Sequence, residues 1–351
     1  MAEREVRIGI IGAGGIVRHR HLPGLRAIPG VAVQVVCNRT RERAEQVATE
    51  FGVPEVETDW RRVIERSDLD AVLIGTPPYL HCEATLAALE AGKHVFCQAR
   101  MARNAAEARA MVEASLRSDR VTMLCPPPNG MRGDRVMRRL IGEGYLGAVR
   151  DVHATGLAAS YADASAPLHW RQDTAISGMN TLTLGMWAEV LHRWLGPHAA
   201  VAAVSRVHTP ARTRVGGGPP ERVRIPESVA IAAELASGAV GSYHFSGVAR
   251  FAPHNTIQIY GAEGTLLYDL ETDEIRGARA GDAALAPVPI PPEEERPWTV
   301  ERDFIAAIRE GRPVEPSFHD GLLYMEFTEA VWRAAESGRR VPLPLETTAG
   351  G

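Results

Sequence analysis

The stretch at residues 6–17, which reads VRIGIIGAGGIV, constrains the fold of this chain more than any other. Its apolar run ends at Gly12-Ala13-Gly14-Gly15, and a segment with helical patterning follows. This pattern predicts a buried strand that turns sharply into a helix, with glycines where the backbone approaches a diphosphate. The N–H groups and the dipole at such a helix start favour phosphate charge. Val17 stands at the third glycine position, so a tight turn without a ligand is the alternative.

The composition bounds the class of protein. The 351 residues are 45% hydrophobic and 23% charged, as in a globular protein, and the length suits two domains. A net charge of −4 argues against nucleic acid and membrane surfaces as partners. No run approaches the ~18 uninterrupted apolar residues of a membrane span, and the opening MAEREVR lacks a secretory apolar region. We therefore expect a cytoplasmic protein.

Cysteine and lysine usage limits the chemistry. Cys37, Cys82, Cys97 and Cys125 form no C-x-x-C pair, and three of them close apolar runs. We expect buried reduced thiols and no metal site. Lys93 is the single lysine of the chain. It precedes a strand and lies roughly 15 Å from the carboxyl end of that strand, so it cannot act as a base there.

Residues 1–125 alternate short apolar runs with helical patterns, which predicts βαβ units and a parallel sheet. The apolar runs cover residues 6–11, 31–37, 70–75, 94–97 and 121–125, and the helical patterns lie near 17–28, 40–51, 79–91 and 104–118. Thr76-Pro77-Pro78 directly follows the third run. It therefore marks the carboxyl end of a strand, the edge where open α/β sheets bind ligands.

The pattern changes after the proline run at 126–128. A helix is predicted at 131–143, closed by Gly144. Few helices then interrupt the strands, which predicts a mostly antiparallel sheet. The predicted strands cover 147–157, 200–208, 228–236, 239–249, 255–260 and 264–269; the predicted helices cover 177–195, 298–310 and 317–337; and Pro/Gly-rich loops cover 210–226 and 281–297. The whole chain is thus an α/β protein with domains at 1–125 and 126–345.

Four segments resemble the glucose–fructose oxidoreductase / inositol dehydrogenase / MocA (Gfo/Idh/MocA) family. They read RIGIIGAGGIVRHRHLPGL, AVLIGTPPYLHCEATLAALEAGKHVFCQ, IQIYGAEGTLLYD and AVWRAAESGRRVPL, and the likeness covers nearly the whole length. The resemblance implies an N-terminal Rossmann domain that binds NAD or NADP. It also implies a C-terminal α/β domain for the substrate and for assembly into a homo-oligomer, a dimer or tetramer. The implied activity is an oxidoreductase acting on a small sugar-like or polyhydroxy molecule.

Cofactor contacts follow from the glycine turn and from the resemblance. The expected residues are Gly12, Gly14, Gly15, Ile16, Asn38, Arg39, Thr76, Pro77, His81, Gln98 and Asn129. An acidic residue after the second strand would favour NAD, whereas an arginine accommodates the 2′-phosphate of NADP. Asn38 is neutral, while Arg39 and Arg43 are cationic, which favours NADP and leaves NAD open. Stacking of Arg39 on the adenine is the alternative.

The chain departs from the family at its usual acid/base residues. Gln98-Ala99-Arg100 replaces the usual Glu-Lys-Pro, and Thr183 and Trp187 replace the Asp and His of Asp-x-Gly-x-His. An arginine does not shuttle protons near neutral pH, but Arg100 could clamp an anion or stabilise an oxyanion.

Other groups must then move the proton and hold the substrate. His169 ranks first and Tyr161 second, because histidine titrates in the right range and a perturbed tyrosine can act. With these we group Arg100 and Thr183 as catalytic candidates. The expected substrate contacts are Gln98, Asn180, Trp187 and Arg171. Thr183, Asn180 and Trp187 are predicted to share one helical face.

Two other functions stay open. A retained NAD could oxidise the substrate transiently and permit elimination or glycoside cleavage. The chain could also be a non-catalytic NAD(P)-binding sensor or subunit.

Overall fold

The computed structural model describes residues 5–126 and 131–346. The chain forms two compact units, each with its own sheet. The first comprises Met1–Pro126 and Thr299–Leu322, and the second Pro127–Trp298 and Leu323–Gly351. Within the described residues, no helix is long and apolar enough to cross a membrane.

The first unit is built on a parallel sheet with the order β3-β2-β1-β4-β5-β6. The strands are β1 (Val6–Ile11), β2 (Val31–Cys37), β3 (Glu55–Glu57), β4 (Ala71–Ile74), β5 (His94–Cys97) and β6 (Thr122–Leu124). β4 is buried at all its positions, as expected for a strand covered by helices on both faces. The strand order reverses between β1 and β4. This reversal is the switch point at which such sheets bind ligands.

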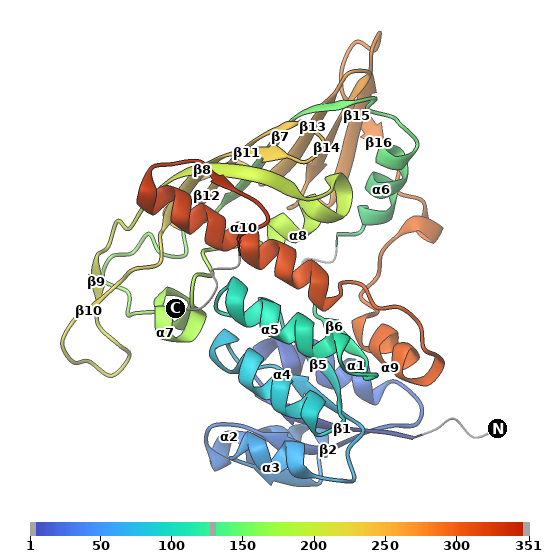
Figure 1. Cartoon of the computed structure of the whole chain (residues 1–351), viewed down its shortest axis with the longest axis vertical. Coiled ribbons are helices and arrows are strands. Elements are labelled where there is room, and N and C mark those ends of the chain that lie inside the picture. The colour runs from blue at the N-terminus through green and yellow to red at the C-terminus, as the bar shows by residue number, and fades with distance from the viewer. Residues whose placement is uncertain (1–4, 127–130, 347–351) are drawn as a thin grey trace. The chain divides into compact units, whose positions relative to one another are not determined.

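Helices flank this sheet (Figure 1). They are a π-helical turn at Val17–His21, α1 (Leu22–Arg26), α2 (Arg41–Phe51), α3 (Trp60–Glu65), α4 (His81–Glu90), α5 (Ala105–Leu116) and α9 (Val300–Glu310). Local chemistry sets their ends: Asn104 caps α5 by accepting the N–H of Glu107 at 2.9 Å, and Gly52 ends α2 at a φ of 64°. The sequence analysis missed β3 and α3, which are too short for a clear periodicity.

The second unit is built on a sheet with the order β16-β15-β14-β13-β7-β12-β11-β8-β17. Its strands are β7 (Val149–Leu157), β8 (His198–Arg206), β11 (Ser228–Leu235), β12 (Val240–Ser246), β13 (Thr256–Gly261), β14 (Gly264–Asp269), β15 (Glu274–Arg279), β16 (Ala286–Val288) and β17 (Val341–Pro342). The neighbouring strands β7 and β12 are parallel, and the remaining described pairs are antiparallel. The carboxyl ends of β7 and β12 therefore lie together.

Helices cover one face of the second sheet (Figure 1). They are α6 (Asp134–Gly142), α8 (Leu184–Leu195) and the later part of α10 (Phe318–Ser337). The other face of the sheet is exposed. Along β11, for example, buried residues on the helix-covered face alternate with exposed residues on the other face. Exposed apolar side chains on this sheet include Val204, 73% exposed, and Val240, 54% exposed.

Three predictions for the second unit need correction. Residues 177–195 do not form one helix: α7 (Thr174–Ser177) ends at Gly178, whose φ of 63° is left-handed, and α8 starts only at Leu184. The loop at 210–226 contains a small hairpin, β9 (Ala211–Arg212) with β10 (Glu221–Arg222). The loop at 281–297 contains β16 and a 3-10 turn at Pro292–Glu294.

Candidate functional site

The glycine turn after β1 has the geometry that its sequence predicts. Gly12 has a φ of +88°, and a Cβ placed on it would lie 2.7 Å from the backbone nitrogen of Thr76. Any larger residue there would collide with the neighbouring turn. At Gly14, by contrast, an added Cβ would meet nothing within 4 Å, and at Gly15 only a His19 atom at 3.9 Å. The turn is thus closely packed at Gly12 and has open space beside Gly14 and Gly15.

Polar groups around this opening fit a dinucleotide. The helix that follows Ile16 starts without a side-chain cap and without an acidic residue in its first turn, so no carboxylate of that turn competes with a phosphate. Asn38 fixes the turn, because its Oδ1 accepts the N–H of Ala13 at 2.9 Å. The Thr76 hydroxyl is buried and has no hydrogen-bond partner among the described residues. A buried hydroxyl without a protein partner fits a position that binds a ligand.

His81 holds this edge of the sheet together. Its ring is fully buried, with Nε2 2.6 Å from the Thr76 carbonyl and Nδ1 3.0 Å from the Arg100 carbonyl. Burial lowers the pKa of His81, although these carbonyls oppose the shift. Both ring nitrogens face backbone oxygens, so His81 orders the loops. Pro77 is the extended N-cap of the 3-10 turn at Pro78–Leu80, which leads into α4.

The Gln98 side chain contacts neighbours within the first unit. Its side chain is 7% exposed; its Oε1 accepts the N–H of Ala99 at 3.1 Å, and its amide nitrogen contacts His21 Nε2. The Nδ1 of His21 lies 2.5 Å from Glu301 Oε1. The sequence analysis named neither His21 nor Glu301 as a candidate residue. The Gln98 side chain is thus engaged inside the first unit, and this placement does not support the expected substrate contact. Arg100 follows, half-buried, after a cis Ala99–Arg100 peptide.

Lys93 lies at the opposite, amino-terminal edge of the sheet. Its Nζ donates to the carbonyls of Arg66 at 2.6 Å and Leu69 at 2.7 Å. Burial lowers the pKa of Lys93, as it would for a catalytic lysine, but the ammonium binds backbone far from the strand ends that follow Ile74 and Cys97. Its role is therefore structural.

We expect Lys93→Met to leave turnover per folded molecule unchanged while lowering stability. Two buried carbonyls would lose their donor, which costs about 1–3 kcal/mol of unfolding free energy. Urea denaturation and steady-state rates on the same preparation measure both quantities. A large loss of turnover at unchanged stability would show that the ammonium takes part in the reaction.

Tyr161 and His169, two catalytic candidates of the second unit, lie on one loop with Arg171. This loop follows β7 and reaches α7. Tyr161 anchors it through its N–H, 2.7 Å from the Gly247 carbonyl, and its ring covers Gly247, where a Cβ would approach to 2.5 Å. The His169 ring lies 6.5 Å from the Tyr161 ring between centroids, and the Arg171 guanidinium stacks 4.1 Å over Trp170. The structure therefore brings together three residues that the sequence analysis named separately.

The hydrogen bonds of His169 define its tautomer. Its Nδ1 accepts the backbone N–H of Arg171 at 3.2 Å, so the neutral ring carries its proton on Nε2. Burial and then the Arg171 charge lower the pKa of His169, which keeps it neutral around pH 7. Burial also lowers the pKa of Arg171, and the Tyr161 phenol is the group that opposes this shift. Neutral His169 is thus a donor beside a tyrosine and a cation.

The prediction that Asn180, Thr183 and Trp187 share one face of a helix is wrong. Thr183 precedes α8, and Asn180 lies outside it, 2% exposed, with its Nδ2 donating to the Ser177 carbonyl at 2.7 Å. Trp187 is 7% exposed and packs edge-on against Phe245 at 5.8 Å. Thr183 lies beside Gly156 of β7, where an added Cβ would approach its hydroxyl to 3.0 Å. Of these residues, Thr183 lies beside the strand that leads into the Tyr161 loop.

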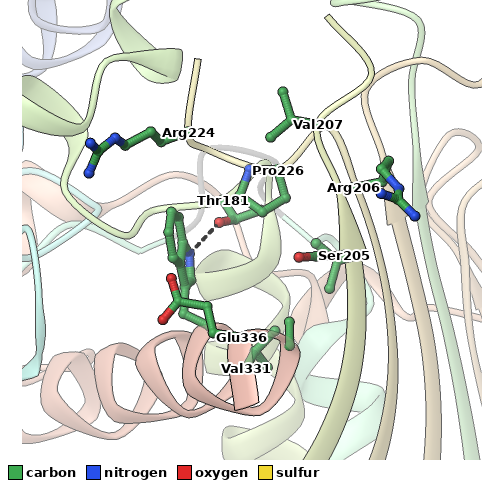
Figure 2. A pocket seen from close by; sticks show the side chains of 11 residues that line it. Thr181, Ser205, Arg206, Val207, Arg224, Pro226, Val331 and Glu336 are labelled. Carbon is green, nitrogen blue, oxygen red and sulfur yellow. Dashed lines mark hydrogen bonds between the residues drawn. The ribbon is translucent and has the colours of Figure 1, made fainter. Parts of the chain in front are cut away.

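Thr181 faces a different space. A cavity of about 290 Å³ separates the end of α10 from β8, and Figure 2 shows its lining. Trp332 Nε1 donates to Thr181 Oγ1 at 2.8 Å, and both residues line this cavity. The bond fixes the segment that leads into Thr183. Asn129, expected near the nicotinamide, lies outside the described residues.

Comparisons with known proteins agree with this arrangement. The family model described as the oxidoreductase family with an NAD-binding Rossmann fold matches residues 6–124, and that of the Gfo/Idh/MocA C-terminal domain matches residues 135–267. Levoglucosan dehydrogenase of Pseudarthrobacter phenanthrenivorans is 29% identical over 97% of this chain and 99% of its own length. The 1,5-anhydro-D-fructose reductase of Ensifer adhaerens is 28% identical over 74% of this chain and 75% of its own length.

Solved structures show the same likeness. A levoglucosan dehydrogenase in complex with NADH and L-sorbose superposes with a TM-score of 0.87 at 30% identity, covering 97% of this chain and 99% of that one. The parallel sheet with its glycine turn, joined to a mostly antiparallel sheet, defines an enzyme of the NAD-binding oxidoreductase class. The chain belongs to the Gfo/Idh/MocA oxidoreductase family.

Proposed function

We propose that this protein is an NAD(P)-dependent oxidoreductase of a sugar-like or polyhydroxy substrate, with Tyr161 as the group that exchanges the substrate proton. The observation that carries the proposal is the cluster of Tyr161, His169 and Arg171 on one loop. The family's usual lysine position holds Ala99, and the single lysine lies at the wrong edge of its sheet. Relatives named for levoglucosan and anhydrofructose support the substrate class.

The first unit would hold the dinucleotide. The open backbone at Gly14 and Gly15 fits a diphosphate, and Asn38, Arg39 and Thr76 surround the same edge. A bound nicotinamide accepts a hydride from a carbinol carbon or donates one to a carbonyl. The protein must orient the substrate hydroxyl and move its proton.

Arg39 and the lean towards NADP can be tested directly. Arg39 is exposed, and no hydrogen bond or ion pair engages its guanidinium within the described chain. We expect Arg39→Ala to weaken NADPH binding about tenfold through loss of a charge-assisted bond, and NADH binding much less. Fluorescence titration measures both. Arg41→Ala is the matched control, because Arg41 already pairs with Glu45 at 2.8 Å. If Arg39→Ala weakens the binding of NADPH and NADH equally, the result would instead support stacking of Arg39 on the adenine.

The second unit would manage the proton. A phenol loses its proton more readily beside a cation, and Arg171 supplies that cation near Tyr161. His169 would add an Nε2–H donor, since its Nδ1 is occupied by the Arg171 N–H. This arrangement reverses the order given by the sequence, which ranks His169 above Tyr161. Thr183 and Arg171 are the proposed substrate contacts in this unit, and Arg100 remains a candidate anion clamp in the first.

The experiment that tests the activity compares three outcomes. Steady reduction of added NAD(P) by a polyol or sugar, followed by nicotinamide absorbance, supports the proposal. Turnover without added cofactor, by protein that retains NAD, would support transient oxidation with elimination or glycoside cleavage. Tight NAD(P)H binding without turnover of any polyol, sugar or glycoside would support a sensor.

Assembly is the last part of the proposal. We propose a homo-oligomer that uses the uncovered face of the second sheet, where Val204 and Val240 are exposed. Sedimentation measures the masses of the wild-type protein and of Val204→Asp in solution. A monomeric wild type would contradict the proposed homo-oligomer. A cytoplasmic location stays part of this proposal.

A further inference from the structure

A buried ion pair lies behind the loop that carries Tyr161 and His169. Arg212, in β9, and Glu227, just before β11, meet at 3.1 Å, and their side chains are 1% and 0% exposed. Neither residue is near the loop in sequence. A pair this deeply buried is costly to desolvate unless its other donors and acceptors are also satisfied.

The guanidinium of Arg212 binds the loop backbone at three places. Its Nη1 donates to the carbonyls of Asp163 at 2.7 Å and Ala166 at 3.0 Å, and its Nη2 donates to the carbonyl of Tyr161 at 2.9 Å. Next to these, the N–H of Leu168 donates to the Thr213 carbonyl at 2.7 Å. One buried side chain thus fixes the loop from Tyr161 to Ala166.

The carboxylate of Glu227 completes the network on the other side. Its Oε2 accepts the N–H groups of His208 at 2.9 Å and Thr209 at 2.8 Å, and its Oε1 accepts Gln172 Nε2 at 3.0 Å. Gln172 in turn uses its Oε1 to accept the His169 N–H at 3.4 Å. The pair therefore reaches both ends of the loop: Tyr161 through Arg212, and His169 through Gln172.

We propose that Arg212 and Glu227 are positioning residues that set the Tyr161–His169 geometry for proton transfer. Well-packed apolar residues can stabilise a core as well as a buried ion pair does, so stability alone does not explain these bonds. Small displacements of a reacting group can cost a large part of its catalytic effect. The inference rests on the proposed function, and it adds residues far from the loop in sequence.

The test uses Arg212→Met and Glu227→Gln in the full chain, with Arg193→Met as a matched control. Arg193 belongs to a different buried cluster, where it pairs with Asp134 at 2.9 Å and is 6% exposed. We expect both loop variants to lower kcat about tenfold, with a smaller change in KM. We also expect a displaced acid limb of the pH–rate profile, faster amide hydrogen exchange over residues 158–173, and unchanged NAD(P)H affinity. Arg193→Met should lower stability without these changes.

The outcomes separate this inference from the proposed function. Unchanged kcat and pH profile in folded Arg212→Met would overturn the positioning role, and so would unchanged exchange over the loop. If wild type turns over no polyol or sugar, the proposed function fails and so does the catalytic role; the exchange experiment then decides only whether the pair orders the loop. If Arg212→Met does not fold, Glu227→Gln, which keeps the side-chain shape, and partial rescue by Arg212→Lys decide the matter.

Discussion

Gly14→Asp is expected to lower the affinity for NAD(H) and NADP(H) by about 10²-fold or more while leaving the fold intact. A side chain is tolerated at this position, since a Cβ meets nothing within 4 Å and the backbone needs no left-handed φ. The added carboxylate would occupy the space proposed for the diphosphate. Like charges brought together in a binding site cost several kcal/mol, which corresponds to this loss.

The measurement is calorimetric titration with both reduced cofactors, alongside thermal unfolding. Gly14→Ala adds a Cβ without a charge, so we expect a smaller loss of affinity than Gly14→Asp shows, and the difference between the two variants measures the effect of the charge. Gly12→Ala differs from both, because Gly12 combines a φ of +88° with a clash at Thr76 and should reduce stability as well. Normal binding by Gly14→Asp would place the dinucleotide elsewhere and remove the basis of the proposed function.

Tyr161→Phe should lower kcat by about 10²-fold, because it removes the hydroxyl proposed to exchange the substrate proton. The phenyl ring keeps the packing against Gly247. Tyr145→Phe is the matched control, since Tyr145 lies in the same unit with the Arg279 guanidinium 5.6 Å from its ring. His169→Ala should cost less, about tenfold, because it removes a donor and not the proton-exchanging group. A larger loss for His169→Ala than for Tyr161→Phe would restore histidine as the acid/base group.

The pH dependence belongs to the same prediction. The pKa of His169 is lowered, so the ring stays neutral at and above its usual range and gains a proton only at more acidic pH. Protonation of Nδ1 would break the bond from the Arg171 N–H. We therefore expect kcat/KM to fall in acid, with the limb displaced to a pH below the ordinary histidine pKa of about 6.5 because the pKa of His169 is lowered. Initial rates across that pH range measure the acid limb of the kcat/KM profile, and this limb should be absent in His169→Ala.

The sequence predicts the first unit well because its signals are local. The glycine turn, the apolar strand before Thr76 and the caps of α2 and α5 each depend on neighbouring residues. The second unit shows the limit of that approach. Gly178 and the left-handed Leu182, with a φ of 50°, interrupt what reads as one amphipathic helix from 177 to 195. The helical spacing of Asn180, Thr183 and Trp187 therefore had no structural basis.

The candidate site was predictable as a set of residue types and not as an arrangement. Tyr161, His169 and Arg171 were recognisable because the usual lysine and histidine positions hold other residues. The order of importance that we propose for them rests on one backbone bond to His169 Nδ1, which no spacing reveals. Arg212 and Glu227 gave no sequence signal, since Arg212 lies within the Pro/Gly-rich stretch at 210–226 and Glu227 directly follows it, and both bind carbonyls or amides of residues distant in sequence.

The burial of Lys93 also has a practical consequence. Its ammonium is the single side-chain primary amine of the chain, it is 7% exposed, and two backbone oxygens hold it. Acylating reagents and amine-directed cross-linkers need an accessible, deprotonated amine. The folded protein should accept such labels at Lys93 only when this region opens, which makes its acylation a chemical reporter of local unfolding.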